Sequence, residues 1–258
     1  MTYCIVIPNY NHTTKLDEFI HRLEEFNLPV IMVNDGSAEQ ATLLFKQLAH
    51  KYSYLTLVEH SVNQGKGAAV QTGLKAAYNQ GFTHALQIDA DGQHDLNDVS
   101  KMLLESKSYP QALISGKPVY DDSVPKHRYY ARNITHFWVW VETLSFQIKD
   151  TMCGYRVYPL TETIELFSKQ SIGKRMDFDI EIMVRLFWRN IDIKFVPTKV
   201  DYPEDGQSHF RALHDNVLIS WLHTRLVLGM LIRLPYLLFH RLVKVKVKTK
   251  KSPADKTA

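Results

Sequence analysis

The sequence predicts an α/β protein built on a doubly wound, mostly parallel sheet and followed by a C-terminal amphipathic helical appendage. Three observations support this fold class. Apolar strand patterns alternate with helical patterns through the first half, polar clusters end three of the strands, and a stretch rich in leucine and aromatic residues follows the last strand. The chain has 258 residues, enough for one large domain with a buried core.

The first half alternates strand patterns with helical patterns. Tyr3 to Ile7 is a continuous apolar run that ends at Pro8, which is typical of a strand buried on both faces. Apolar residues between Lys15 and Phe26 fall on one face of a helix. Further strands are expected at residues 30–33, 54–58 and 85–88, with helices around residues 43–48 and 65–80.

The second half is less regular. Helices are expected at residues 129–147 and 177–188, a strand at 191–202 and a loop at 203–208. From Ala212 to Leu242 the pattern is helical, with a bend expected at Pro235. Since no linker is apparent, we expect one domain over residues 1–210, amphipathic membrane-interface helices over 211–243 and a basic, disordered tail over 244–258.

The formal net charge of +4 is too mild to indicate a nucleic-acid partner, and we expect none. The positive excess is concentrated in the lysines between Lys244 and Lys251. The cysteines, Cys4 and Cys153, show no metal-ligand spacing, which fits a reducing compartment.

Residues 221–239 are dense in leucine and aromatic side chains. Arg225 and Arg233 interrupt this stretch, so no uncharged run approaches the roughly 20 residues that span a bilayer. A helix lying in the membrane interface, flanked by lysines that attract anionic lipid, is the favoured interpretation. The alternative is a helix that packs on the core, followed by a solvated tail.

Polar clusters follow three of the expected strands. They are Pro8-Asn-Tyr-Asn11, Asn34-Asp-Gly-Ser37 and Asp89-Ala-Asp91. In parallel sheets ligands bind beyond the carboxyl ends of the strands, so we expect all three clusters to lie on one rim.

The acids Asp89 and Asp91, with Ala90 between them, predict a metal site at the end of the fourth strand. Hard oxygen ligands suit Mg²⁺ or Mn²⁺, and such ions are commonly held by one or two carboxylates together with substrate phosphates. Gln93 and His94 follow closely and could complete the ligand shell. The alternative is a solvated turn that precedes a helix.

Three other groups of polar residues could bind a ligand, and each could instead have a purely structural role. Asp35 could accept hydrogen bonds from a nucleotide base, or belong to a plain turn. Lys66, between two glycines at a helix start, could bind an anion, although the spacing is not that of a P-loop. Arg128 and Arg132 could clamp phosphate oxygens, or be solvated helix charges.

The acids Asp177 and Asp179 open a helix, where the helix dipole favours negative charge. Either could instead serve as a catalytic base. The sequence leaves these two readings open.

The motifs just described resemble the family 2 glycosyltransferases, which have the GT-A fold. The segments are Val6 to Asn11, Val33 to Ser37, Asn63 to Gly67 and Asp89 to His94, in that order. Residues 150–156, 178–181 and 206–208 are similar to the branch that holds dolichyl-phosphate mannose synthase and the polyprenyl-phosphate sugar transferases. The resemblance covers about residues 3 to 210.

The resemblance implies a role for each matching position. The donor nucleotide would lie against Pro8, Tyr10, Asn11, Asp35, Lys66, Asp89 and Ala90. The metal would be held by Asp89, Asp91 and Gln93, and catalytic roles would fall to Asp91, Asp177, Asp179, Arg128 and Arg132. The acceptor loop would contain Gly206, Ser208 and His209. His209 stands where the lipid-phosphate branch usually has a lysine, which weakens the case for a phosphate acceptor.

The resemblance implies an inverting, metal-dependent glycosyltransferase that uses a UDP- or GDP-linked sugar. The expected acceptor is a membrane lipid such as a polyprenyl phosphate, and the expected location is the cytoplasmic face of the inner membrane, peripherally bound. One alternative is transfer to a hydroxyl of a glycan or glycolipid in cell-envelope biosynthesis. Another is a non-catalytic nucleotide-sugar-binding protein at the membrane. A nucleotidyltransferase is disfavoured, because its glycine loop normally follows the first strand.

Overall fold

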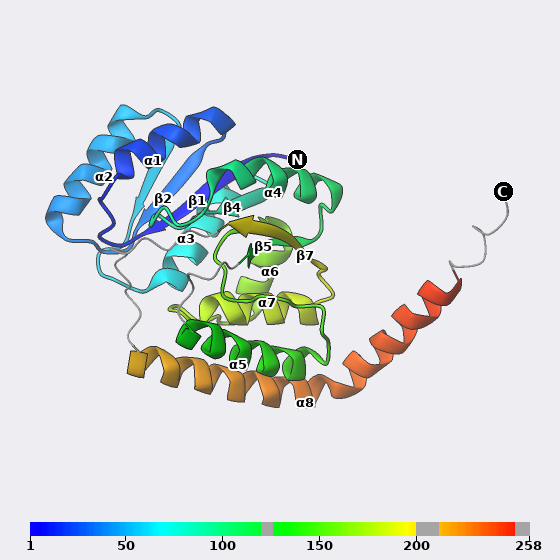
Figure 1. Cartoon of the computed structure of the whole chain (residues 1–258). Coiled ribbons are helices and arrows are strands. Elements are labelled where there is room, and N and C mark those ends of the chain that lie inside the picture. The colour runs from blue at the N-terminus through cyan, green and yellow to red at the C-terminus, as the bar shows by residue number, and fades with distance from the viewer. Residues whose placement is uncertain (120–125, 200–211, 251–258) are drawn as a thin grey trace, which may run out of the picture.

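The computed structural model describes residues 1–119, 126–199 and 212–250, with only the backbone described at 126–131, 212–214 and 240–250. A seven-stranded sheet forms the centre, in the order β3-β2-β1-β4-β6-β5-β7 (Figure 1). The strands are β1 (Tyr3–Asn9), β2 (Val30–Asn34), β3 (Leu55–Glu59), β4 (His84–Gln87), β5 (Leu113–Val119), β6 (Arg156–Pro159) and β7 (Ile193–Lys199).

The sheet is parallel except at β6, which runs antiparallel to both β4 and β5. The pairs β1–β2, β2–β3, β1–β4 and β5–β7 are parallel. All strands other than β6 therefore place their carboxyl ends on one edge of the sheet, which we call the rim. The expectation of a mostly parallel sheet is confirmed, although β5 and β6 were not among the expected strands.

Helices cover both faces of the sheet because successive side chains of a buried strand point to opposite faces. Ile5 and Ile7 pack on the side of α1 (Leu16–Arg22), α2 (Glu39–Lys51) and α4 (Val99–Ser108). Cys4 and Val6 pack on the side of α3 (Lys66–Asn79), α6 (Leu160–Lys169) and α7 (Phe178–Trp188). Two short 3₁₀ helices, η1 (Leu23–Phe26) and η2 (Leu96–Asp98), complete this part of the chain. The arrangement is the doubly wound one.

Two further helices lie together beyond α7. The long C-terminal helix α8 (Ala212–Lys250) runs along α5 (Lys126–Thr143), and its last part extends away from the body (Figure 1). Pro235 lies inside α8, and the helix continues past it. α8 reaches Lys250, and the division of the chain at residues 210 and 243 stays a prediction. Residues 251–258 lie outside the described residues.

Candidate active site

The ends of β1, β2 and β4 lie side by side on the rim. Asn9 and Asn34 occupy paired positions at the ends of β1 and β2, and β4 pairs with β1 on the other side. The start of α3 also reaches this place, because the loop before it is hydrogen-bonded to Asp35. The predicted convergence of the polar clusters is thus observed for the segments around Asn9, Asn34 and Asp89.

Lys66 lies between two carboxylates at the centre of the rim. Its Nζ donates to Oδ2 of Asp89 at 2.7 Å and lies 3.3 Å from Oδ2 of Asp179. The three residues come from the start of α3, the end of β4 and the first turn of α7. His94 adds a fourth polar group, with Nε2 at 3.7 Å from Asp89. One cation and two acids, far apart in sequence, therefore form a single cluster.

Interactions within the cluster hold Lys66 and Asp89 in their charged forms. Burial alone would lower the pKa of Lys66, but the charges of Asp179 and Asp89 outweigh it and hold that pKa well above its ordinary value. Burial would raise the pKa of Asp89, yet Lys66 and His94 hold it well below the usual range of a carboxyl group. Lys66 is therefore a cation, and Asp89 an anion, throughout the physiological pH range.

Arg156 lies fully buried behind Asp179. It donates through Nη1 to the carbonyl of Asp179 at 2.8 Å and through Nη2 to the carbonyl of Thr151 at 2.7 Å. Nη1 also lies 3.7 Å from Oδ1 of Asp179. Sequence reasoning assigned Arg156 no role, because burial of an arginine cannot be read from a turn pattern. Two cations, Lys66 and Arg156, thus face the same carboxylate.

Gly154 allows the cluster to close. A Cβ at this position would lie 2.7 Å from Oδ2 of Asp89, 2.8 Å from Nζ of Lys66 and 2.9 Å from Nε2 of Gln87. No side chain fits there without displacing the ion pair. The segment from Asp150 to Arg156, which carries part of the family resemblance, therefore forms one wall of the site.

Asp91 and Gln93 lie on the loop that follows Asp89. Asp91 is exposed, Gln93 is half-buried, and the Gln93 N–H donates to Oδ1 of Asp91 at 3.1 Å. Ala90, between the acids, is buried. Two buried atoms beside Asp89 have no hydrogen-bond partner within the described residues, namely Oδ1 of Asp179 and Nδ1 of His94.

The residues present fit a divalent cation of the kind expected. Within residues 1–119, 126–199 and 212–250, no group of three acidic, histidine or cysteine side chains is arranged to hold a metal by itself. A Mg²⁺ or Mn²⁺ ion commonly takes one or two carboxylates and completes its shell with water and substrate phosphates. Asp89 and Asp91 can supply those carboxylates, and Gln93 an amide oxygen. Their role as ligands stays a prediction.

Asp35 is buried and holds the loop that leads into α3. Oδ1 accepts from the Gln64 N–H at 2.9 Å and lies 2.7 Å from Nδ1 of His60. Oδ2 accepts from the Gly65 N–H at 2.8 Å and from Nδ2 of Asn63 at 3.0 Å. Because a carboxylate offers about four acceptor positions, these partners use all of them. The structure gives Asp35 an anchoring role, and its contact with a nucleotide base stays a prediction.

The end of β1 lies beside this loop. Pro8 is buried and pairs with Val33 of β2, while Tyr10 is half-buried. Asn11 has a positive φ of 59°, its N–H donates to Oγ of Ser37 at 2.9 Å, and its Oδ1 accepts from the Ala38 N–H at 2.8 Å. Asn11 thus joins the end of β1 to the loop before α2, and the donor-binding roles of these residues stay predictions.

The acids Asp177 and Asp179 separate in space. Oδ1 of Asp177 accepts from the N–H of Arg175 at 3.0 Å, and a Cβ on Gly173 would lie 2.2 Å from its Oδ2. Asp177 therefore closes the turn before α7, whereas Asp179 belongs to the Lys66 cluster. Of the two candidate bases, the structure places only Asp179 beside Asp89.

Arg132 forms a bidentate ion pair with Asp150, with its Nε at 2.5 Å and its Nη2 at 3.0 Å from the carboxylate oxygens. Asp150 is buried and also accepts from the N–H groups of Met152 and Cys153. Arg132 therefore holds the Asp150–Arg156 segment, and a role at a phosphate stays a prediction. The side chain of Arg128 and the residues Gly206, Ser208 and His209 lie outside the described part of the chain.

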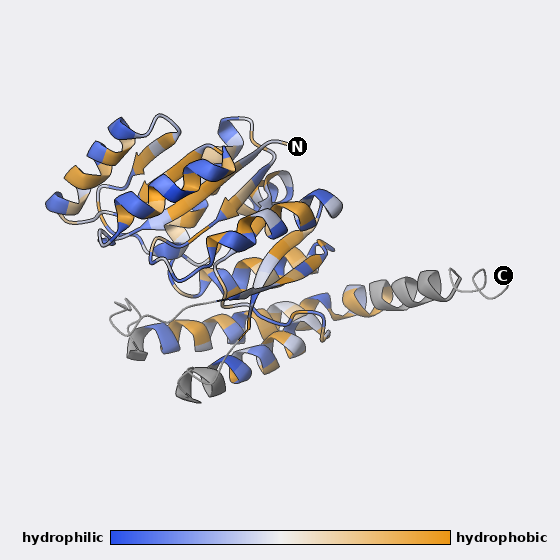
Figure 2. Cartoon of the chain, turned by 45° about the horizontal axis from the view of Figure 1, so that its top comes forward, coloured by the Kyte–Doolittle hydropathy of each residue, from blue (hydrophilic) through white to orange (hydrophobic). Residues whose placement is uncertain are grey.

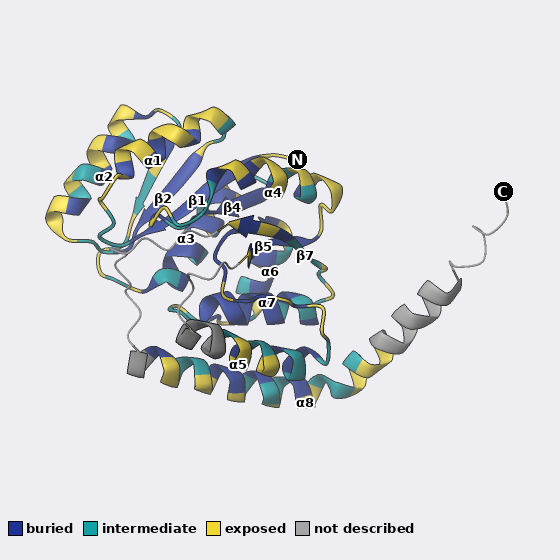
Figure 3. Cartoon of the chain, in the orientation of Figure 1, coloured by how far each residue is buried: buried dark blue, intermediate teal, exposed yellow. Residues whose placement is uncertain are grey.

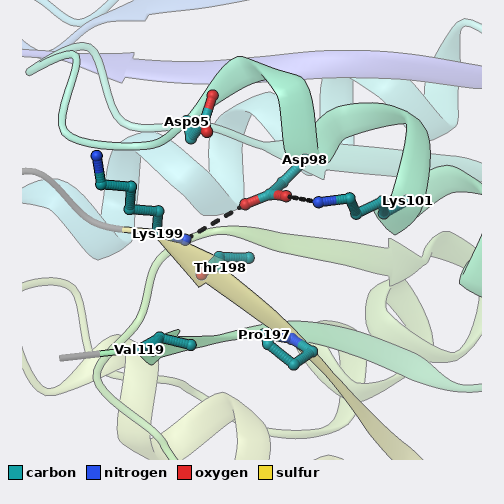
Figure 4. A pocket seen from close by; sticks show the side chains of 7 residues that line it. All are labelled: Asp95, Asp98, Lys101, Val119, Pro197, Thr198 and Lys199. Carbon is teal, nitrogen blue, oxygen red and sulfur yellow. Dashed lines mark hydrogen bonds and ion pairs between the residues drawn. The ribbon is translucent and has the colours of Figure 1, made fainter.

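A pocket of about 380 Å³ lies at the carboxyl ends of β5 and β7 (Figure 4). Asp98 bridges its walls, because it binds Nζ of Lys101 at 2.7 Å and accepts from the N–H of Lys199 at 3.3 Å. The pocket is lined by Asp95, Asp98, Lys101, Val119, Pro197, Thr198 and Lys199. It opens on the same rim, a few residues beyond Asp91 along the chain.

Comparisons with known proteins bear on the family of this chain. The family model described as "Glycosyl transferase family 2" matches residues 4–175. A dolichyl-phosphate beta-glucosyltransferase of Trichomonas vaginalis is 30% identical over 201 residues, which are 69% of this chain and 59% of the relative. The UDP-N-acetylglucosamine–dolichyl-phosphate N-acetylglucosaminyltransferase of Methanococcus voltae is 24% identical over 233 residues, covering 84% of this chain and 91% of the relative. The chain spans 59% and 65% of the length of two Trichomonas vaginalis relatives.

Solved structures share the fold. Glucosyl-3-phosphoglycerate synthase from Mycobacterium tuberculosis aligns with a TM-score of 0.64 at 15% identity, over 89% of this chain and 79% of that one. A mannosyltransferase from Pyrobaculum calidifontis, solved with GDP-Man and Mn²⁺, aligns with a TM-score of 0.58 at 16% identity, over 90% of this chain and 64% of that one. The GT-A fold implied by the sequence motifs is confirmed.

Proposed function

Since the chain belongs to glycosyl transferase family 2, we propose that it transfers a sugar from a UDP- or GDP-linked donor to a membrane-lipid acceptor, with inversion at the anomeric carbon. The acceptor class follows from the relatives, which are named for dolichyl-phosphate acceptors. A polyprenyl phosphate is the representative acceptor. The protein acts at the cytoplasmic face of a membrane, to which α8 attaches it peripherally.

The observation that carries this proposal is the cluster of Asp89, Lys66 and Asp179 on the rim. A donor diphosphate brings two negative charges to be neutralised, and a permanently charged lysine beside a metal-binding carboxylate meets that need. Asp89, Asp91 and Gln93 would hold a Mg²⁺ or Mn²⁺ ion. When bound, the ion acts as a Lewis acid that stabilises the leaving nucleoside diphosphate.

The acceptor decides whether a base is required. A lipid phosphate is already ionised and attacks without one, whereas a hydroxyl must lose a proton. Asp179 is the candidate base because it lies in the cluster, and Asp177 is not, because its carboxylate closes a turn. Transfer to a hydroxyl of a glycan or glycolipid is therefore the second candidate function, favoured by Oδ1 of Asp179, which accepts no hydrogen bond within the described residues.

The test of the function is a donor panel with mass analysis of the lipid-extracted product. Wild-type protein is incubated with membrane lipids, Mn²⁺ and each UDP- or GDP-sugar in turn. The proposal expects a lipid extract whose mass gains one sugar, together with release of the nucleoside diphosphate. Release of pyrophosphate would indicate a nucleotidyltransferase, and no turnover with any donor would favour a non-catalytic nucleotide-sugar-binding protein.

A pair of matched variants separates the two acceptor classes. For a phosphate acceptor, Asp179→Asn changes donor affinity but leaves the dependence of kcat on pH unchanged. For a hydroxyl acceptor it removes the base and lowers kcat by roughly 10²-fold or more. Asp177→Asn serves as the control, since it perturbs the start of α7 without reaching the cluster.

A further inference from the structure

We infer that α5 and α8 together form a two-helix membrane face, which binds the surface of an anionic bilayer with α8 lying along the membrane rather than across it. The two-helix face consists of the outward side chains of Ile134, Phe137, Trp138, Val217, Trp221, Leu228, Leu231 and Ile232. The inference deepens the proposed function, on which it rests for the lipid acceptor.

By length and composition alone, α8 could cross a membrane. Residues Asp215–Phe239 form an apolar stretch of 25 residues, the one such helix found in the described part of the chain. A spanning helix must leave the protein body over about 30 Å of hydrocarbon. Whether α8 is free to do so depends on what its inner face contacts.

The inner face of α8 is attached to the catalytic domain along most of this stretch. Leu222, Leu226 and Met230 are buried in the core that includes α5 and α7. Gly229 lets the helix approach closely, since a Cβ there would lie 3.0 Å from the ring of Trp188. The guanidinium of Arg233 lies 4.9 Å from the centre of the Trp188 ring.

Polar contacts also hold the inner face of α8 against α5 and α7. Nδ1 of His223 lies 2.6 Å from Oε1 of Glu142 on α5, and Nη2 of Arg225 lies 3.6 Å from Oε2 of Glu181 on α7. Residues 215–233 therefore run along the body for about 27 Å at the rise of an α-helix. Leu234 and Leu237 also pack on the core, and the hydroxyl of Tyr236 accepts from Nδ2 of Asn190 at 2.8 Å. Only the residues after Leu237 extend beyond the body, and the apolar part of these is too short to cross a bilayer.

The outer face of α8 is apolar and has no protein partner within the described residues. Trp221 is 59% exposed, Leu228 56% and Ile232 81%. These positions recur at spacings of seven and four residues, so they lie on one side of the helix, opposite the buried stripe. Figure 3 shows the alternation of buried and exposed residues along the coloured part of α8, and Figure 2 shows apolar residues along the same part.

The neighbouring helix α5 continues this surface. Ile134 is 63% exposed, Phe137 55% and Trp138 40%, and their spacing of three and four residues puts them on one side of α5. α5 and α8 pack side by side (Figure 1). Monomeric soluble proteins rarely expose so many large apolar side chains together, so the surface indicates an interaction site.

Charge identifies the partner as an anionic membrane. The only acids in the sequences of α5 and α8 are Glu142 and Asp215, and both are buried. Arg225 and Arg233 contact the body on the inner face. The other bases of α8 follow the apolar stretch in the sequence and are Arg241, Lys244, Lys246, Lys248 and Lys250. Apolar aromatic side chains with only basic charges around them are typical of helices that lie in the headgroup region of anionic bilayers.

The first test measures vesicle binding of the full chain without donor. We expect binding to vesicles of phosphatidylcholine with phosphatidylserine, and at least about tenfold weaker binding to phosphatidylcholine alone. The double variant Phe137→Ser/Trp138→Ser should bind about tenfold more weakly. The matched control, Leu43→Ser/Leu104→Ser, removes two exposed leucines from α2 and α4 and should bind as the wild type does. Equal binding by both variants, or a dimer in solution that binds no vesicles, would overturn the inference.

The second test decides between lying and spanning. The native cysteines Cys4 and Cys153 are buried, so single cysteines introduced as Asn216→Cys and Ser252→Cys can be labelled selectively. With the protein added to sealed vesicles, a membrane-impermeant maleimide should label both positions from outside. If one of the two cysteines were labelled only after detergent is added, α8 would span the bilayer and the inference would be overturned.

The donor panel of the proposed function, run in parallel with membrane lipids dispersed in detergent, keeps the two claims separate. Vesicle binding without any donor turnover would sustain the membrane face and contradict the proposed function. Turnover without vesicle binding would contradict the membrane face and leave the transferase proposal intact.

Discussion

Lys66 is held in place by the two carboxylates that it neutralises. Its Nζ lies within 3.3 Å of both Asp89 and Asp179, and Gly154 leaves just enough room for the group. Buried like charges destabilise a fold unless a counter-charge is present. The residues that bring chemistry to the rim are therefore also residues on which the local fold depends, and substitutions there have two effects that must be measured separately.

Substituting Lys66→Met should destabilise the protein and weaken donor binding. Asp89 would lose its closest cation, so burial would raise its pKa. Because the pKa of Asp89 is depressed in the folded protein, its stabilising contribution is present above the ordinary carboxyl value and is lost as pH falls through the folded value. We expect the free energy of unfolding at pH 7, measured with urea, to fall by about 3 kcal/mol. An unchanged stability would show that Lys66 does not compensate the acids.

Substituting Arg132→Met should affect the fold more than catalysis. It leaves the carboxylate of Asp150 buried without its bidentate partner, which should cost about 3 kcal/mol of stability. The double variant Arg132→Met/Asp150→Asn should recover part of that loss, as a double-mutant cycle in urea would show. A folded Arg132→Met protein with a strongly raised KM for donor would instead support the phosphate-clamping role predicted from the sequence.

At the scale of secondary structure, α8 is joined to α5 by a buried acid–histidine pair. Glu142 is fully buried, its Oε1 lies 2.6 Å from Nδ1 of His223, and its Oε2 has no hydrogen-bond partner within the described residues. Burial raises the pKa of Glu142, and the hydrogen bond and charge of His223 lower it less strongly. The attachment of α8 therefore includes a carboxyl group whose pKa lies above its ordinary value.

This pair predicts a pH dependence with a definite sign. The folded protein binds a proton on Glu142 more tightly than the unfolded chain, so Glu142 lowers the stability as pH rises from its ordinary value of 4.5 through the higher folded value. Glu142→Gln should remove that decrease, and unfolding profiles from about pH 4 to pH 8 should show a flatter curve for the variant. Glu165→Gln is the control, because ion pairs with Lys169 and Arg189 lower the pKa of that exposed acid. A profile unchanged by Glu142→Gln would contradict the assignment.

The elements of the first half could be predicted from sequence because each carries a local signal. β1, β2, β3 and β4 are short apolar runs ending in polar residues, and they lie within a residue or two of the expected positions. β6 and β5 carried no such signal. Their pairing depends on contacts between distant segments, such as Ile114 with Val157. The amino-acid composition of a strand also does not reveal that it runs antiparallel within a mostly parallel sheet.

Part of the candidate site could also be predicted from the sequence. Asp89 and Lys66 were identified because strand ends converge, which is a property of parallel sheets. The sequence could not predict that Asp177 and Asp179 have different partners, because the two acids are only two residues apart. Their contacts in the folded chain distinguish them. Arg156 was missed because its burial is a tertiary property.

At the scale of the whole molecule, α7 connects the rim to the proposed two-helix membrane face. α7 carries Asp179 at its start and contacts α8 through Glu181 and Trp188. The same helix therefore touches both the site and the membrane-facing appendage. A lipid acceptor held at the bilayer surface would meet the donor without leaving the membrane, which joins the proposed chemistry to the proposed location.

The central claim is that Asp89 and Asp91 hold a divalent cation against the diphosphate of a sugar donor. Calorimetric titration of UDP and of GDP, with and without Mn²⁺, tests it most directly in wild-type and Asp91→Asn protein. Asp91 is exposed, so this substitution should change stability by no more than about 0.5 kcal/mol. We predict that Mn²⁺ raises the affinity of the wild type for one of the two nucleotides by about tenfold or more, and that Asp91→Asn removes most of this gain. Equal affinities with and without Mn²⁺ for both nucleotides would contradict the account.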